Sequence, residues 1–438
     1  MMKKLALIGI LFLLINNANA QFKNIMLDND LTGYPPCEPS IAINPKNPDN
    51  IVGAAILDKV YTTFDGGKSW SLQRLTSTYG VFGDPCVIAD KKGKFYYLHL
   101  SDPSGSRWGS DALLDRIVCQ MSKDGGKPWN NGGFMGNHHP KDQDKEWAVA
   151  SPFKNRIYAT WTQFDEYESK DTADKSNILF SYSKNKGKKW SEAVRINQFS
   201  GDCLDDDDTV EGAVPAVGPN GEVYVAWSWN EQLWFDRSTD GGKTWLDEDI
   251  KVANQPKGWA LDIPGLSRSN GMPVLACDLS KGPNQGNLYI NWADQKNGTH
   301  DTDIWIARSS DGGNTWSEPI RVNQDKPGRH QFLTWMAIDQ TTGYLYIVYY
   351  DRRNHRGEAT DLYLAWSKDG GKTFQEQKIS EKPFTPNPMG FFGDYNNISA
   401  HAGRICPIWT RMENGRNSVW TAVISQKELD ELESESVN

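Results

Sequence analysis

Five acidic residues recur where strand-like runs of the chain begin: Glu38, Asp84, Glu146, Glu211 and Asp394. If these runs line a common centre, five carboxyl groups gather around it, and carboxyl groups that lie close together raise one another's pKa values. A carboxyl group with a raised pKa suits general acid catalysis, so we predict these five residues as catalytic candidates. The alternative is a structural collar, in which each acid accepts hydrogen bonds from the backbone of a neighbouring strand. The sequence leaves both interpretations open.

Arginines gather on the same expected face, in the loops that join one unit to the next and in those that join second to third strands. They are Arg107, Arg268, Arg329, Arg352, Arg353, Arg411 and Arg416. Arginine binds a carboxylate through two parallel N–H groups, so two or three that converge would hold an acidic sugar. We predict Arg268, Arg329, Arg352 and Arg411 as substrate-binding residues. Surface pairing with acidic loops is the alternative for each of them.

Histidines and a run of aspartates offer two further chemistries. His138, His139, His300, His330 and His355 lie in these loops, and a histidine base would suit a polysaccharide lyase, although many loop histidines are ordinary surface residues. Residues 205–208 are four consecutive aspartates without the glycine and the spacing of an EF-hand loop. We expect no required cofactor, with Ca²⁺ at this acid run as an option and a solvated loop as the alternative.

One eight-residue motif recurs six times along the chain. It begins with Ser or Thr, as at Thr63, has an acidic residue two places later, then glycine, and closes on an aromatic residue such as Trp70. The acidic positions are Asp65, Asp124, Asn185, Asp240, Asp311 and Asp369, and the third copy also has Lys186 where the others have glycine. Asp accepts hydrogen bonds from nearby backbone N–H groups and glycine adopts positive φ, so the motif predicts a hairpin turn with a structural role.

Each motif closes a third strand-like run, with two runs before it and a fourth after it, which makes four short strands per unit of about sixty residues. This pattern predicts an all-β fold, a single β-propeller of four-stranded blades. A seventh unit at 394–424 lacks the motif and a fourth strand, and residues 21–28 could supply that strand and close the ring. We predict seven blades, with six as the alternative. The propeller is expected to span residues 21–425, followed by a charged tail, 426–438. Residues 426–435 could form a helix, but the charge run favours a solvated end.

The first twenty residues have the pattern of a secretory signal peptide. Lys3 and Lys4 precede an apolar run, and Ala18-Asn19-Ala20 is a small-x-small cleavage site. We therefore expect export to the periplasm or the medium, with 1–20 removed, and no later membrane span. The six cysteines, Cys37, Cys86, Cys119, Cys203, Cys277 and Cys406, are expected either to form disulfides or to be buried as small hydrophobic residues. The net charge of −9 argues against a nucleic-acid partner.

The six motifs resemble the Asp-box, or BNR, repeats of sialidases and their relatives, and the copies span most of the chain, from Thr63 to Phe374. The resemblance implies a sialidase-like propeller with an arginine triad for a sialate carboxylate. It also implies a Tyr nucleophile paired with Glu, and an Asp acid/base. By position, Tyr395 is the candidate nucleophile and Glu211 its partner. The Phe/Tyr-Arg-Ile-Pro motif that carries the family's first Arg has no counterpart before the first copy, and the first Arg of the chain is Arg74.

Three functional hypotheses follow from these observations. The first is an exo-acting glycoside hydrolase of sialidase-like type, which uses paired carboxylates, or Tyr and Glu, together with Arg on the loop face of the propeller. The second is a polysaccharide lyase with a His or Tyr base beside Arg. The third is a propeller that binds glycans or proteins without catalysis. In each case the expected partner is an oligosaccharide, polysaccharide or glycoconjugate, or for the third a protein.

Overall fold

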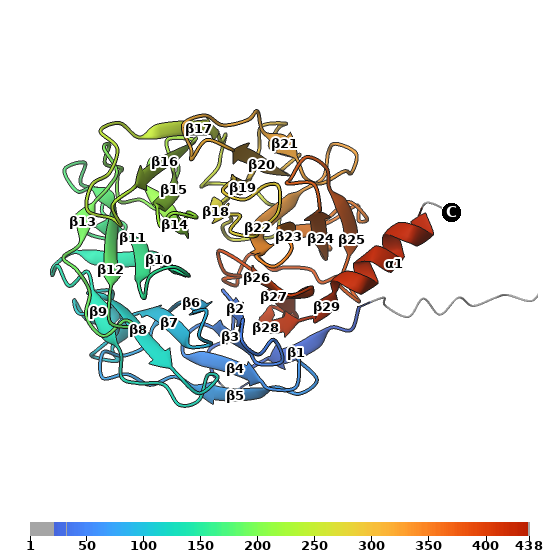
Figure 1. Ribbon diagram of the computed structural model, residues 1–438. Coiled ribbons are helices and arrows are strands. Elements are labelled where there is room, and N and C mark those ends of the chain that lie inside the picture. The colour runs from blue at the N-terminus through green and yellow to red at the C-terminus, as the bar shows by residue number, and fades with distance from the viewer. Residues whose placement is uncertain (1–21, 32, 437–438) are drawn as a thin grey trace, which may run out of the picture.

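The computed structural model describes residues 22–31 and 33–436, which form a closed ring of seven antiparallel sheets (Figure 1). The ring confirms the predicted all-β propeller and decides between seven blades and six. The predicted signal peptide, 1–20, lies outside the described residues. All six cysteines are buried and unpaired, so burial is the alternative that the structure supports.

In blades 1 to 6 the strands run outward from the centre in chain order. Blade 1 holds β2 (Ser40–Ile43), β3 (Ile51–Ala55), β4 (Lys59–Thr63) and β5 (Ser71–Arg74). Blade 2 holds β6 (Gly83–Ala89), β7 (Phe95–Leu100), β8 (Ile117–Ser122) and β9 (Gly133–Met135), with a short 3₁₀ helix, η1 (Arg107–Gly109), between β7 and β8. Blade 3 holds β10 (Asp142–Ala150), β11 (Ile157–Phe164), β12 (Ser176–Ser183) and β13 (Val194–Arg195).

The second half of the ring repeats the pattern. Blade 4 holds β14 (Glu211–Val217), β15 (Val223–Trp229), β16 (Gln232–Ser238) and β17 (Ile250–Asn254). Blade 5 holds β18 (Val274–Cys277), β19 (Leu288–Asp294), β20 (Asp303–Ser309) and β21 (Ile320–Arg321). Blade 6 holds β22 (Gln331–Asp339), β23 (Tyr344–Asp351), β24 (Asp361–Ser367) and β25 (Gln375–Lys378).

Blade 7 joins the two ends of the described chain, as predicted. Its three inner strands are β26 (Asn397–His401), β27 (Arg404–Glu413) and β28 (Arg416–Thr421), and the short β29 (Ile424–Ser425) also pairs with β27. The outer strand is β1 (Ile25–Asp28), whose Ile25 and Met26 pair with Thr421 and Trp420 of β28. An early strand therefore completes the last blade and closes the ring (Figure 1).

The charged tail is a helix and not the solvated end that we predicted. The helix α1 (Gln426–Ser436) begins with a capping box, in which the Ser425 hydroxyl accepts the Glu428 N–H and the Glu428 carboxylate accepts the Ser425 N–H. Leu429 is fully buried, and Trp366 of blade 6 donates to Glu433. Among the described residues no helix is long and apolar enough to cross a bilayer.

The six repeated motifs form hairpin turns between third and fourth strands, which we call Asp turns. In five of them the acidic or amide side chain accepts a backbone N–H four residues on, as Asp311 does from Thr315 at 3.0 Å. The turn at Asp124 differs because the residue four places on is Pro128, which has no N–H. The side-chain and backbone hydrogen bonds from Thr315 lower the pKa of Asp311 to about 2, which fits a structural role.

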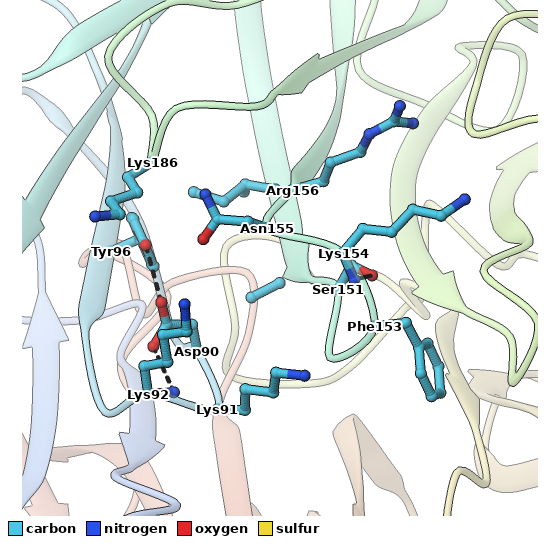
Figure 2. A pocket seen from close by; sticks show the side chains of 12 residues that line it. Asp90, Lys91, Lys92, Tyr96, Ser151, Phe153, Lys154, Asn155, Arg156 and Lys186 are labelled. Atoms are coloured by element: carbon cyan, nitrogen blue, oxygen red, sulfur yellow. Dashed lines mark hydrogen bonds between the residues drawn. The ribbon is translucent and has the colours of Figure 1, made fainter.

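The two faces of the ring carry different connections. Loops that lead into the first strand of each blade, and those between second and third strands, open on one side, which we call the loop face. The Asp turns and the turns between first and second strands open on the other side, the turn face. Each face holds a cavity beside the early blades. On the loop face a cavity lies over the inner ends of blades 1 to 3. On the turn face a cavity lies between blades 2 and 3 (Figure 2).

Candidate active site

The side chains at the centre of the loop face are positioned by a bulge that recurs at the start of the inner strands. In β6, β10, β14 and β22 the register shifts so that two residues oppose one on the second strand. The first bulged residue has positive φ in each blade: Asp84, Lys145, Gly212 and Leu333. A bulge redirects side chains, and Asp84 and Lys145 thereby line the cavity of the loop face. Glu38, just before β2, has the same positive φ.

The buried ammonium group of Lys145 is the hub of the site. Its Nζ lies 2.8 Å from Asp394, 3.6 Å from Asp84 and 3.9 Å from Asp144, so blades 2, 3 and 7 each bring a carboxylate to it. Burial opposes the charge of Lys145, but the three carboxylates outweigh that effect and hold its pKa well above the usual value. The carboxylate oxygens of Asp84 and Asp144 that face Nζ are at most about 7.5 Å apart, which is the sum of their distances to it.

Arg268 is the second cation of the site and reaches it from the loop before β18. Its Nε and Nη2 both donate to Asp394, and its Nη1 lies 2.6 Å from Asp205. Asp205 also accepts hydrogen bonds from Tyr167 at 2.9 Å and from Trp259 at 2.8 Å. Burial works against ionisation of Asp394, but Arg268 and Lys145 hold its pKa well below the usual range. Asp394 is therefore a permanent anion that positions both cations.

Asp144 has the protonation behaviour of a general acid. Burial raises its pKa to about 7; Lys145 opposes this rise, while Asp84 and Asp205 add to it. Asp144 lines the same cavity as Asp84. The two carboxyl groups consequently share a ligand-sized space, and one of them can hold a proton near neutral pH.

The three predicted glutamates are more deeply placed than expected. Burial raises the pKa of Glu38, Glu146 and Glu211 well above the usual value, with further increases from Asp84 for the first two and from Asp205 for Glu211. Both carboxyl oxygens of Glu146 and of Glu211 lack a hydrogen-bond partner within the described residues. Of the three, Glu38 lines the cavity, and it accepts the Asp394 N–H at 3.1 Å.

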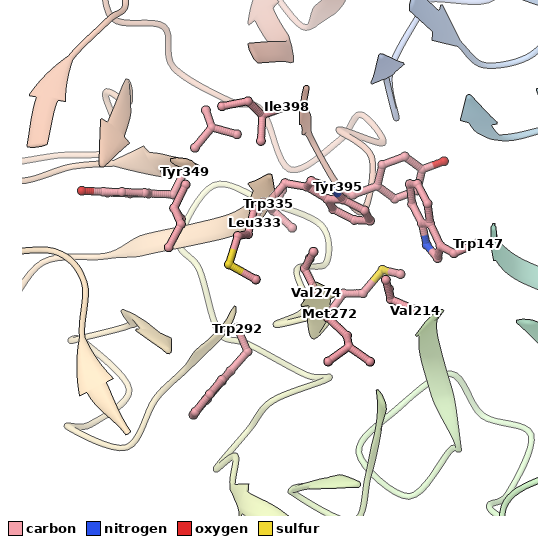
Figure 3. Packing of buried hydrophobic residues seen from close by; sticks show 14 of the residues in the cluster. Trp147, Val214, Met272, Val274, Trp292, Leu333, Trp335, Tyr349, Tyr395 and Ile398 are labelled. Carbon is pink, nitrogen blue, oxygen red and sulfur yellow. The ribbon is translucent and has the colours of Figure 1, made fainter. Parts of the chain in front are cut away.

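Tyr395 lies in an apolar plug beneath the acidic residues. Its ring packs 5.2 Å from Trp147 and 6.1 Å from Trp335, and those two tryptophans are 4.2 Å apart (Figure 3). Burial, and then the charges of Asp84 and Glu38, raise its pKa well above the usual value. Burial and the neighbouring carboxylates therefore oppose the phenolate that a nucleophile needs. Glu211, the predicted partner, is not among the groups that act on Tyr395 most strongly.

The cavity above the plug has a volume of about 490 Å³ and combines acids with an aromatic wall. Trp108 of η1 is 68% exposed and stacks on Tyr167, with ring centroids 5.9 Å apart. Tyr34, Phe82 and Phe391 complete the aromatic lining. Exposed aromatic faces beside carboxyl groups are suited to sugar rings, which have apolar faces and polar edges.

Three of the four predicted arginines lie outside this cavity. Arg352 donates to the Pro264 carbonyl and to Thr360, and Arg411 donates to the carbonyls of Lys382 and Pro383. Arg329 donates to the Arg356 carbonyl. Backbone carbonyls of other loops hold these guanidinium groups away from the cavity, so the predicted arginine cluster does not form, and of the four predicted arginines Arg268 alone reaches the site.

The predicted histidines lie away from this cavity, and the aspartates of the acid run face in different directions. Among the described residues that line the cavity there is no histidine. His330 is buried beside Arg352 and bonds to Thr302, and its burial lowers its pKa to about 4. In the acid run, Asp205 faces Arg268, whereas carboxylate oxygens of Asp206 and Asp208 lie with one of Asp202 within 4.8 Å of one another. A Ca²⁺ ion at this group stays a prediction.

The sequence analysis did not identify Asp144, Lys145, Tyr167 or Trp108. The bulge in β10 explains the first two, because simple alternation places Glu146 at the centre, whereas the extra residue turns Lys145 toward it. Tyr167 and Trp108 come from loops between second and third strands of neighbouring blades. Exposed aromatic residues in loops beside the acid-bearing strands were the available signal.

Comparison with known proteins gives a distant relationship. The chain is 24% identical over 311 residues to a sialidase from Bacteroides fragilis (strain YCH46), an alignment that covers 64% of this chain and 52% of that protein. The chain therefore spans about half the length of the curated relative that it matches. No family model matches the sequence. The similarity confirms the sialidase-like resemblance that was expected from the repeated motifs.

Two solved structures were compared with the fold of this chain. The Trypanosoma rangeli sialidase has a TM-score of 0.48 at 13% identity, over 84% of this chain and 57% of that one. The Penicillium chrysogenum alpha-L-arabinanase complexed with arabinobiose has a TM-score of 0.49 at 13% identity, over 92% of this chain and 98% of that one.

Proposed function

We propose that this protein is a glycoside hydrolase that takes the terminal sugar of a glycan into the cavity of the loop face. The observation that carries the proposal is the pair of carboxyl groups, Asp84 and Asp144, which line one cavity on either side of Lys145. The aromatic wall and the similarity to a protein named as a sialidase support it. Export, inferred from residues 1–20, would place the activity outside the cytoplasm.

The proposed reaction divides the work between the two aspartates. Protonated Asp144 donates its proton to the glycosidic oxygen as the bond from that oxygen to the anomeric carbon breaks. Asp84 either attacks the anomeric carbon or takes a proton from the attacking water. Retaining enzymes place such carboxyl groups about 5–5.5 Å apart and inverting enzymes about 6.5–9.5 Å, and the upper limit of about 7.5 Å here allows either. Lys145, Arg268 and Asp394 hold the pair in place, and this reaction requires no cofactor.

The charges of the site favour an uncharged terminal sugar. Lys145 faces three carboxylates, and Arg268 is engaged by Asp394 and Asp205. A sugar carboxylate would have to displace one of these anions, because Arg329, Arg352 and Arg411 are held elsewhere. A sialoside is the second candidate substrate, since the relative is named as a sialidase and the Arg268 side chain is 41% exposed. A lyase with a histidine base is less favoured because the described residues that line the cavity include no histidine, and the cations among them, Lys145 and Arg268, are both paired with carboxylates.

The experiment is a screen of the chain from Gln21 onward against uncharged aryl glycosides and aryl sialosides, with ultraviolet detection of the unsaturated product of a lyase. Asp144→Asn should reduce kcat about 10²- to 10⁴-fold, and less for leaving groups that need no proton. The exposed Asp171→Asn, in a loop of the same blade, is the matched control and should leave kcat unchanged.

The pH dependence of kcat tests whether Asp144 acts as the proton donor. Its pKa of about 7 means that the acid form is present below pH 7 and is lost as the pH rises through 7, so kcat should fall on the alkaline side. Asp144→Asn should remove that limb of the profile. Full activity of both Asp144→Asn and Asp84→Asn would refute the proposed roles, and release from sialosides alone would favour the second candidate.

A further inference from the structure

We infer that the cleft on the turn face between blades 2 and 3 is a second glycan-binding site, which takes a sugar residue that carries a sulfate or carboxylate group. The cleft has a volume of about 240 Å³. Its walls are the β6–β7 turn, the β10–β11 turn and the Asp turn of blade 3 (Figure 2). It lies on the opposite face from Asp84 and Asp144, so it is separate from the proposed active site.

The cleft concentrates positive charge on an acidic protein. Five basic residues line it: Lys91, Lys92, Lys154, Arg156 and Lys186. Within the described part of the chain none of the five takes part in an ion pair. The whole chain has a net charge of −9, so unpaired cations gathered around one concave surface require an explanation, and an anionic ligand is the simplest one.

The acidic residue that lines the cleft, Asp90, takes its hydrogen bonds from its own turn and strand. Asp90 accepts hydrogen bonds from the N–H groups of Lys92 and Lys94 at 2.8 and 3.0 Å, and from the hydroxyl of Tyr96 at 3.1 Å (Figure 2). Its carboxylate therefore holds the turn in shape. Lys154 and Arg156 project toward blade 4 in the same view, where Arg156 donates to the Gly241 carbonyl, so Lys91, Lys92 and Lys186 carry the positive charge of the cleft.

The position of Lys186 is the strongest sign of a selected site. It has φ +67 in the third Asp turn, where the other five turns place Gly66, Gly125, Gly241, Gly312 and Gly370, all with positive φ. A lysine in this region is strained, whereas glycine is not. The protein thus accepts strain at the one Asp turn that borders this cleft and gains a cation there.

The space beside the equivalent glycine differs from one blade junction to another. A Cβ atom at Gly125, Gly241 or Gly370 would lie 2.6, 2.3 or 2.5 Å from a side chain of the preceding blade, so those three junctions are filled. At Gly312 the nearest atom would be 3.6 Å away, so that junction also has room for a side chain. At the junction of blades 2 and 3 the space holds a side chain, Lys186, and still leaves a cavity.

The dimensions and the lining favour a sugar over an extended polyanion. Phe153 at the rim is 50% exposed and offers a face for a sugar ring, and Asn155 offers an amide for hydroxyl groups. A nucleic acid needs a continuous basic track for its phosphates, whereas this cleft is a single local cavity on a chain of net negative charge. One ring with an anionic substituent meets both the charge and the aromatic surface.

The test is an isothermal calorimetric titration of the chain from Gln21 onward. The four ligands are dextran sulfate, hyaluronan, unsulfated dextran and a single-stranded DNA oligonucleotide. We expect dextran sulfate or hyaluronan to bind with an affinity that falls as salt rises, and unsulfated dextran not to bind. The ligand that binds distinguishes sulfate from carboxylate. Binding of DNA as tight as that of the sugars, or no binding of either anionic sugar, would overturn the inference.

Two variants and a control locate the site. Lys186→Gly combined with Lys92→Ser should weaken binding at least tenfold, and Lys186→Gly restores the glycine of the other turns, so folding should be preserved. Phe153→Ser should weaken sugar binding but not the binding of inorganic sulfate. Lys243→Ser with Lys372→Ser removes two exposed lysines from other Asp turns of the same face and should change affinity less than twofold. Equal losses in this control, or no loss in Phe153→Ser, would contradict the proposed site.

Discussion

Two residues of the candidate active site, Asp84 and Lys145, adopt backbone conformations that disfavour their own side chains. Both have positive φ at a β-bulge, and the equivalent position of blade 4 is Gly212. Strained residues of this kind persist where the surrounding structure determines them, and they are concentrated at functional sites. Here the bulge brings the ammonium group of Lys145 within 4.0 Å of three carboxylates. The strained backbone at the bulge is therefore what places Lys145 among the carboxylates.

Replacing the hub tests how far the carboxylates depend on it. Lys145→Met leaves Asp84, Asp144 and Asp394 without their shared cation, and removal of one partner from a buried ionic group costs about 3–5 kcal/mol. Urea unfolding at pH 7 should show a loss of this size. The pKa of Asp394 is lowered in the folded state, so its stabilising contribution is present above its unfolded value of 3.8 and disappears as the pH falls. The loss should therefore persist down to about pH 4 and shrink only below the unfolded value of 3.8.

A lysine from the same blade provides the comparison. Lys154→Met changes an exposed residue of the β10–β11 turn and should alter the free energy of unfolding by less than about 0.5 kcal/mol. If Lys145→Met were equally mild at pH 7, the carboxylates would not depend on Lys145, and its role as a positioning residue would be wrong.

At the scale of the element, the Asp turn joins the third and fourth strands of each blade through a buried hydroxyl group. In blade 5 the Ser309 hydroxyl accepts the Gly313 N–H at 2.9 Å and donates to Asp311 at 2.7 Å. Ser309→Ala leaves the buried N–H of Gly313 without a partner, which costs about 1–3 kcal/mol. Urea unfolding should show this loss with no change in the activity of the loop face. The adjacent, exposed Ser310→Ala should have almost no effect, and equal effects would contradict the role of the hydroxyl.

The elements also show what the sequence could predict. The turns and strands were predictable because glycine, Asp and strand periodicity recur six times, and the missing fourth strand of blade 7 indicated β1. The helix α1 was considered but a solvated end was preferred, because the charge run concealed a capping box, Ser425 to Glu428, and one buried face around Leu429. The acidic residues Asp84 and Asp394 were predicted to lie at the centre from their position at strand starts. Asp144 and Lys145 were not, because a one-residue bulge changes which side chains face the centre and leaves no clear mark in the periodicity.

At the scale of the molecule, the candidate active site depends on a closed ring. Its residues come from loops and strands of blades 1, 2, 3, 4, 5 and 7, and Asp394 of blade 7 must meet Lys145 of blade 3 and Arg268 of blade 5. The cysteines form no disulfides in the structure, so pairing of β1 with β28 is the link that closes the ring. Asn24 adds a second link, because its amide donates to the Ile379 carbonyl and its carbonyl oxygen accepts the Glu381 N–H of blade 6.

Removal of the closing strand should therefore damage both stability and the distant site. A chain that begins at Leu31 lacks β1, Asn24 and the buried Phe22, and the loss of a buried phenylalanine side chain alone costs about 3–5 kcal/mol. Urea unfolding should show at least that decrease, and the affinity of the loop face for its substrate should fall because Asp394 loses its fixed position. Met26→Ser, which changes an exposed side chain of β1 and keeps the strand pairing, should alter neither quantity. Unchanged stability in the shortened chain would mean that packing of the inner strands closes the ring without the outer one.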